Sequence, residues 1–178
     1  YTNAGVDRPA ADYLSLNTFN LDDPLIDDPS EHFDVKTYVG NYATNVITMD
    51  NASLSPDLVW IKSRANNGSA HFLSDVIRGG TKVIKSDSDA AEFTRSDHIQ
   101  SFDTSGFTLG ADGTSNLNTD SLVAWCWDAG TTTDTNNTDG SITPTGVRAN
   151  TSAGFSIVSF NSGSSGQQTV GHGLNAVP

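Results

Sequence analysis

The stretch LVAWCWDAG, residues 122–130, places one tryptophan on each side of the one cysteine of a 178-residue chain. Successive side chains of an extended strand point to opposite faces. One face of such a strand would carry Leu122, Ala124 and Cys126, and the other Val123, Trp125 and Trp127. Both faces are apolar, and the following Asp-Ala-Gly is typical of a turn. We therefore expect a strand that is covered on both sides inside a β-sandwich.

The cysteine in this stretch suggests two roles, packing or nucleophilic chemistry. A buried cysteine packs as a small hydrophobic residue. A reactive thiol needs a lowered pKa, yet no Lys or Arg lies within ten positions of Cys126. We expect Cys126 to be buried and unpaired, with a role in packing.

The composition narrows the classes of function. The chain has 9 Lys and Arg against 21 Asp and Glu, a net charge of −12. A nucleic-acid binder or a protein of anionic membrane surfaces would carry the opposite sign, so neither partner is expected. One cysteine allows no intrachain disulfide, and no apolar run is long enough for a membrane span.

Short alternating segments predict an all-β fold. The segments FDVKTYV and PDLVWIKSR alternate in the manner of strands, and KVIK, HIQSF and GFTLG are shorter candidates bounded by turn residues. Several strands at this spacing favour an antiparallel β-sandwich. The residues expected to be largely buried in it are Trp60, Ile61, Phe107, Trp125 and Trp127.

The composition divides the chain into four parts. Residues 1–31 contain paired aspartates next to prolines and are expected to form an extended acidic arm. Residues 32–130 are the predicted sandwich. Residues 131–153 contain few large apolar side chains and are interpreted as a polar linker or loop. Residues 154–178 are interpreted as a second, truncated repeat.

The repeat interpretation depends on an ungapped comparison at an offset of 122 residues. Phe33 then matches Phe155, Val35 matches Ile157, and Tyr38 matches Phe160. Turn residues follow both aromatic segments at corresponding places. These positions suggest that the chain begins the same β-domain a second time after the linker.

No arrangement of residues predicts catalysis, a cofactor or a metal. His71, Ser74 and Asp75 lie close in sequence, but no nucleophile-elbow motif accompanies them. The four histidines have no metal-ligand spacing, and one cysteine cannot form a zinc site. Tyr42, in a turn segment, is the aromatic residue expected to contact a glycan.

Several phrases in order resemble a repeated domain of long virion proteins from tailed bacteriophages, many of them marine or cyanobacterial viruses. The phrases are SPDLVWIKSR, DVIRGGTKVI, SFDTSGFTLG, LVAWCWDAG and GFSIVSFNSGSSGQQTVGHGLNAVP. The resemblance covers residues 32–178. It implies a concanavalin-like or jelly-roll β-sandwich in a tail fibre or tailspike, usually trimeric. It implies no catalytic residues.

These expectations lead to one principal hypothesis and three alternatives. The principal hypothesis is a non-enzymatic tail-fibre or tailspike segment that spaces or presents a host-binding surface, in the virion and extracellular after release. The alternatives are a glycan-binding lectin-like domain, a polysaccharide depolymerase and a capsid decoration protein. The expected partners are other copies of the chain in a homotrimer, other virion proteins and host surface polysaccharide. Residues 1–31 are expected to make the contacts between subunits.

Overall fold

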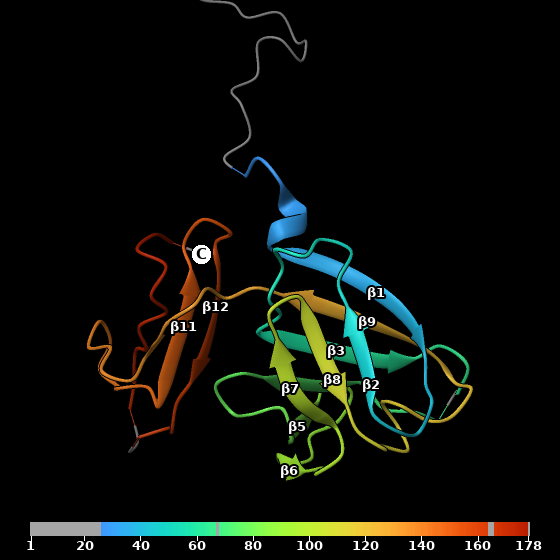
Figure 1. Cartoon of the computed structure of the whole chain (residues 1–178). Helices are drawn as coiled ribbons and strands as arrows, with labels where there is room; N and C mark the ends of the chain where they lie inside the picture. Colours follow the sequence, from blue (N-terminus) through green and yellow to red (C-terminus); the bar gives the residue numbers. More distant parts are fainter. Residues whose placement is uncertain (1–25, 67, 164–165, 178) are drawn as a thin grey trace, which may run out of the picture.

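The computed structural model describes residues 26–66, 68–163 and 166–177, and its regular structure is almost entirely β (Figure 1). A single turn of 3₁₀ helix, η2 (Pro29–Glu31), precedes the strands. No helix in this part of the chain is long and apolar enough to cross a membrane. The predicted arm lies outside the described residues except for positions 26–31.

The larger sheet has six strands in the order β1-β9-β3-β4-β5-β6. Its strands are β1 (Phe33–Val39), β3 (Leu58–Ser63), β4 (Phe72–Asp75), β5 (Lys82–Lys85), β6 (Phe93–Thr94) and β9 (Ser121–Trp127). All neighbours are antiparallel, and β9 pairs along its full length with β1. Residues 122–127 of the stretch LVAWCWDAG therefore lie on an inner strand.

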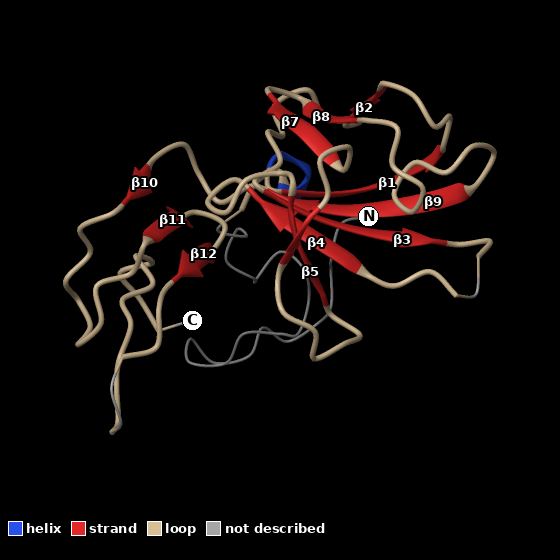
Figure 2. Cartoon of the chain, turned by 90° about the horizontal axis from the view of Figure 1, so that it is seen from below, coloured by secondary structure: helices blue, strands red, loops and turns tan. Residues whose placement is uncertain are grey.

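A second sheet packs on one face of the first, as the view in Figure 2 shows. It contains β2 (Asn45–Thr48), β7 (Ile99–Asp103) and β8 (Gly106–Leu109) in the order β2-β8-β7, again antiparallel. The prediction of an all-β antiparallel sandwich is confirmed.

The core lies between these two sheets. The face of β9 that carries Cys126 points into this core. Cys126 is fully buried and forms no disulfide, as predicted. Burial raises the pKa of the Cys126 thiol to about 12, so the thiol stays protonated. The remaining buried cluster consists of Ile47, Met49, Leu54, Val59, Ile61, Ile99, Phe107, Leu109, Leu122 and Ala124.

The prediction that all three tryptophans belong to this core is wrong. Trp60, Trp125 and Trp127 are only partly buried and share the other face of the six-stranded sheet. The second sheet covers one face only, so strand alternation leaves these rings on the outside. Trp60 and Trp125 shield each other there, with ring centroids 5.4 Å apart.

The structure also corrects the prediction of a linker or loop at residues 131–153. This segment contains β10 (Thr133–Asp134) and β11 (Gly146–Asn150), which form a third sheet with β12 (Phe155–Ser159) in the order β10-β11-β12. The strand β11 gives a weak apolar signal because Val147 is its one buried large side chain. Main-chain pairing with β12 holds the rest.

Candidate functional site

The feature that joins the sandwich to the third sheet is a cluster of three aromatic rings, which we call the ring stack; Phe155 is stacked on Trp127, and Phe33 is tilted against it by 47°. The ring of Trp127 lies 5.0 Å from that of Phe33 and 6.0 Å from that of Phe155, measured between centroids. Trp127 ends β9, Phe33 begins β1 and Phe155 begins β12. The last strand of the sandwich thus contacts the first residue of two strands that lie 122 positions apart in the sequence.

A buried ion pair lies beside this stack. The Asp57 side chain is 3 % exposed and pairs with the Arg148 guanidinium at 3.2 Å, while its other oxygen accepts a hydrogen bond from the Ala129 amide. Arg148 also donates from Nε to the Gly130 carbonyl at 2.6 Å. Asp57 precedes β3 and Arg148 belongs to β11, so the pair links the sandwich to the third sheet. Burial raises the pKa of Asp57 to about 6.

A second polar contact closes the other side of the junction. The side-chain amide of Asn150, at the end of β11, donates to Asp128 at 2.9 Å and lies 3.1 Å from Nδ1 of His32. His32 immediately precedes β1, and Asp128 immediately follows β9. Together the stack, the ion pair and this amide fix β11 and β12 against one end of the sandwich. We call these residues the junction: His32, Phe33, Asp57, Trp127, Asp128, Arg148, Asn150 and Phe155.

Strands β1 and β12, which the offset of 122 residues matches, are paired through opposite edges. The His32 carbonyl accepts from the Asp128 amide, so the even-numbered residues of β1 direct their main-chain groups toward β9. The Ser159 carbonyl accepts a hydrogen bond from the Thr145 amide, so the odd-numbered residues of β12 direct their main-chain groups toward β11. The offset of 122 is even, so residues matched between β1 and β12 direct their main-chain groups to corresponding edges. The strand β11 therefore occupies the edge of β12 that corresponds to the edge of β1 left unpaired within the described residues. The repeat itself stays a prediction.

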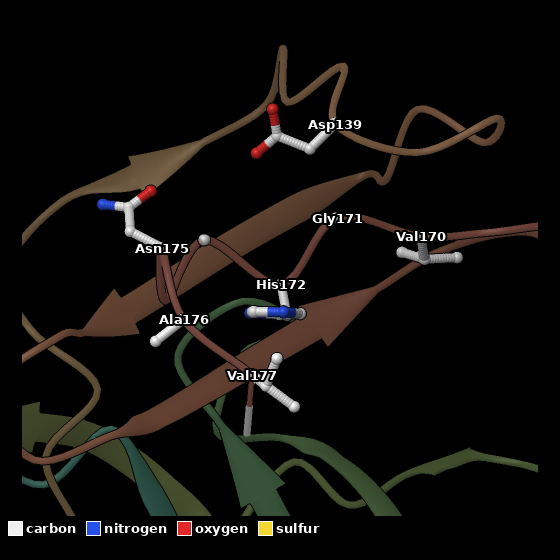
Figure 3. A pocket seen from close by; sticks show the side chains of 8 residues that line it. Asp139, Val170, Gly171, His172, Asn175, Ala176 and Val177 are labelled. Atoms are coloured by element: carbon white, nitrogen blue, oxygen red, sulfur yellow. The ribbon is translucent and has the colours of Figure 1, made fainter.

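One surface pocket lies in the third sheet's own region (Figure 3). Asp139, His172 and Asn175 contribute its polar side chains, and glycines and small aliphatic residues form the rest. The His172 Nδ1 accepts a hydrogen bond from the Leu174 amide, and Asp139 accepts one from Asn137. Within the described part of the chain these three side chains form no hydrogen bond or ion pair with one another, so the pocket presents no assembled acid–base pair.

A buried polar cluster supports the loop between β8 and β9. His98 is fully buried, and its Nδ1 lies 2.8 Å from the Ser115 hydroxyl. That hydroxyl donates to Asp112, so it accepts from Nδ1–H and leaves Nε2 of His98 unprotonated. Burial lowers the pKa of His98 to about 4. The imidazole is therefore neutral at pH 7.

The burial of neutral His98 predicts a loss of stability in acid. Because its pKa is lower in the folded chain than its ordinary 6.5, the contribution of His98 is complete above pH 6.5 and falls as the pH drops toward 4. The difference in the free energy of unfolding amounts to about 3 kcal/mol at 1.36 kcal/mol per pKa unit.

Urea unfolding at several pH values would measure this loss of stability, with His98→Gln as the variant that lacks the pH dependence. The raised pKa of Asp57 acts in the opposite direction between pH 6 and 4 in both proteins, so their difference isolates His98. Equal slopes would contradict the assignment.

The structure does not assemble His71, Ser74 and Asp75 into a catalytic arrangement. The Ser74 hydroxyl is buried and donates to the Lys82 carbonyl at 2.8 Å. The Asp75 carboxylate accepts hydrogen bonds from the amides of Ile77 and Arg78 and from the Arg78 side chain. The buried Nδ1 of His71 has no hydrogen-bond partner in the part of the chain that the structure describes.

Tyr42, the predicted glycan contact, is 54 % exposed and adopts a positive φ of 52°. Its amide donates to the Asn116 carbonyl at 2.8 Å, which holds the turn against the loop between β8 and β9. The ring lies beside Gly113, since a Cβ at Gly113 would be 3.9 Å from Tyr42 Cε2. An exposed ring held by its main chain is suited to contact a ligand.

Sequence reasoning missed most of the junction. Asp57 and Arg148 lie 91 positions apart, and Arg148 falls in the segment interpreted as a linker. The offset of 122 residues was the available signal, because it pairs Phe33 with Phe155, the two rings that Trp127 contacts. It gave no indication of the ion pair.

Comparisons with known proteins give one match. Residues 28–178 match the model of a family described as "Domain of unknown function (DUF7483)". Neither the curated proteins nor the solved structures contain a match. The matched region begins just before η2 and extends through the sandwich, the junction and the third sheet. The chain therefore belongs to the DUF7483 family.

Proposed function

We propose that this chain is a structural module of a bacteriophage virion, a segment of a tail fibre or tailspike that spaces or presents a host-binding surface. The observation that carries the proposal is the junction, which joins one β-sandwich to the strands that follow it through a ring stack and a buried ion pair. Consecutive β-units held at fixed geometry are suited to building a long, stiff protein. The resemblance of residues 32–178 to repeated domains of phage virion proteins supports the same function.

The proposal includes assembly with other chains. The outer edge of β1 is unpaired within the described residues, and Phe33, Val35 and Val39 beside it are exposed. Such an edge favours pairing or packing with another chain. A homotrimer in which residues 1–31 contact a neighbouring subunit would cover it, although most of that arm lies outside the described residues.

Localisation in purified particles tests the proposal. Mass spectrometry of gradient-purified virions would determine whether the chain is present, and cryo-electron microscopy with an antibody against the sandwich would locate it. We expect the chain at the tail, in a copy number divisible by three. Absence from particles would overturn the proposal, and labelling of the capsid surface would replace it with the decoration-protein alternative.

A further inference from the structure

A pocket of about 260 Å³ lies between the loop that follows β3, the strands β4 to β6 and the loop that precedes β9. The residues of its lining that matter here are Phe72, Lys85, Phe93, Arg95, Thr114 and Asp120. Two cations thus meet at one pocket in a chain whose net charge is −12. We call it the basic pocket.

Lys85 lies over aromatic rings, and the nearby Asp87 carboxylate interacts with it electrostatically without forming an ion pair. Its Nζ lies 5.4 Å from the centre of the Phe93 ring and 6.0 Å from that of Phe72. Such cation–π contacts orient an ammonium group and leave its hydrogen-bond donors unused. Lys85 makes no hydrogen bond or ion pair with any residue that the structure describes. A lysine beside a pocket whose ammonium donors are unused by the described residues indicates a position for an external anion.

Arg95 is oriented from behind, so that one edge of its guanidinium remains available. Its Nε donates to Asp112 at 2.5 Å, and its guanidinium carbon lies 5.8 Å from the Phe72 ring centre. Asp112 is itself fixed by the amides of Thr114 and Ser115 at 2.8 Å. Neither Nη group of Arg95 has a hydrogen-bond partner in the described structure. A guanidinium held in this way can bind a carboxylate through its free edge.

Asp120 offers a hydrogen-bond acceptor to a ligand in the basic pocket. It is 8 % exposed and lines the basic pocket, and its carboxylate forms no hydrogen bond or ion pair within the described residues. Its oxygens are not among the buried polar atoms without a partner, so solvent reaches them, and a ligand hydroxyl would donate in place of that solvent. The ligand should therefore combine an anionic group for Lys85 and Arg95 with hydroxyl groups for Asp120.

We propose that the basic pocket binds a carboxylate-bearing sugar, such as a uronic acid unit of an acidic polysaccharide. The partly exposed ring of Phe93 provides an apolar surface for the C–H groups of a pyranose ring. Tyr42 lies beside Gly113, which lines the same pocket, so its ring is placed to contact a neighbouring sugar. The proposal gives a ligand class to the host-binding surface of the proposed function and rests on that function only for the source of the sugar.

The overall negative charge opposes a polyanion, but distance limits its effect. Screening at physiological salt reduces interactions between exposed charges beyond about 8 Å. Direct contacts to Lys85 and Arg95 inside the pocket are screened much less. We therefore expect binding of an acidic sugar to persist at physiological ionic strength.

Isothermal titration of the whole chain with trigalacturonate tests the proposal, with the neutral trimer of galactose and sodium acetate as comparison ligands. We expect trigalacturonate to bind at least about 10-fold more tightly than either comparison ligand. Lys85→Gln should weaken trigalacturonate binding by about 10-fold or more, because it removes the unpaired cation. Lys82→Gln is the matched control on the same strand. It removes a lysine that binds the Thr94 hydroxyl outside the pocket and should change binding less than twofold.

Three results would overturn the proposal: no binding of trigalacturonate, equal binding of the neutral trimer or of acetate, or equal effects of the two lysine variants. Neither lysine is buried, so we expect both variants to fold. Unfolding curves of the two variants would verify this. The titration uses purified protein and is independent of location in a particle. A failure here would leave the proposed virion role intact, and absence from particles would leave the sugar site intact.

Discussion

Replacing Asp57 with alanine is expected to lower the free energy of unfolding by about 3–5 kcal/mol, because it leaves the partly buried Arg148 without its counter-charge. The substitution also removes the acceptor of the buried Ala129 amide, which sits 2.8 Å from the Asp57 carboxylate. Both losses fall at the junction. Urea unfolding followed by tryptophan fluorescence would measure the effect, since Trp127 lies there.

Asp57→Asn is the matched control. The asparagine retains a side-chain oxygen for the Ala129 amide and loses the charge opposite Arg148, so it should cost less than the alanine variant. A double-mutant cycle with Arg148→Ala would then give the coupling energy of the pair. A loss below about 1 kcal/mol for Asp57→Ala, together with no coupling to Arg148, would show that the ion pair does not hold the junction.

Replacing Phe107 with alanine is expected to cost about 3–5 kcal/mol, as is typical of truncating a buried aromatic residue. Phe107 is fully buried on β8 and packs edge-on against Tyr38 of the facing sheet, with ring centroids 6.4 Å apart. Phe107→Leu retains much of the volume and should cost less than half as much. Denaturant unfolding measures both variants. If Phe107→Ala lost less stability than a substitution of the exposed Val46, the core would lie elsewhere.

Much of the fold was predictable because strand alternation is a local property. Alternation along residues 122–127 predicted that Leu122, Ala124 and Cys126 share one face of a strand, and that face lies against the core. The same pattern did not reveal that the opposite face, with Trp125 and Trp127, has no covering sheet among residues 26–66, 68–163 and 166–177. Hydrophobicity on both faces of a strand indicates contact on both sides, but it does not distinguish a sheet from a ring stack as the source of that contact.

The candidate sites were less predictable because they combine residues that are distant in sequence. Tyr42 was recognised as an exposed turn aromatic, yet the pocket beside it joins Lys85 on β5, Arg95 after β6 and Asp120 before β9. None of these three stands in a recognisable motif. Their meeting depends on the sheet order β3-β4-β5-β6 and on the loop before β9, which the sequence pattern does not specify.

The junction explains how the β-sandwich and the third sheet could keep a fixed position relative to each other. Trp127 contacts the starts of two strands at once, and Asp57 and Arg148 join the segment before β3 to β11. Apart from Phe33, which is partly exposed at the edge of β1, these contacts involve buried or partly buried side chains, so they resist motion more than an exposed polar linker would. A stiff connection is what the proposed tail-fibre role requires.

The distance between the two sides of the junction tests this central claim most directly. Spin labels on Ala52→Cys in the sandwich and Thr143→Cys in the third-sheet region, both exposed positions, would be introduced in a Cys126→Ala background. Pulsed electron–electron double resonance between the two labels should give one narrow distance distribution. The substitution Trp127→Ala should broaden that distribution. A broad distribution in the protein with an intact junction would contradict the account, because the two β-units would then move independently.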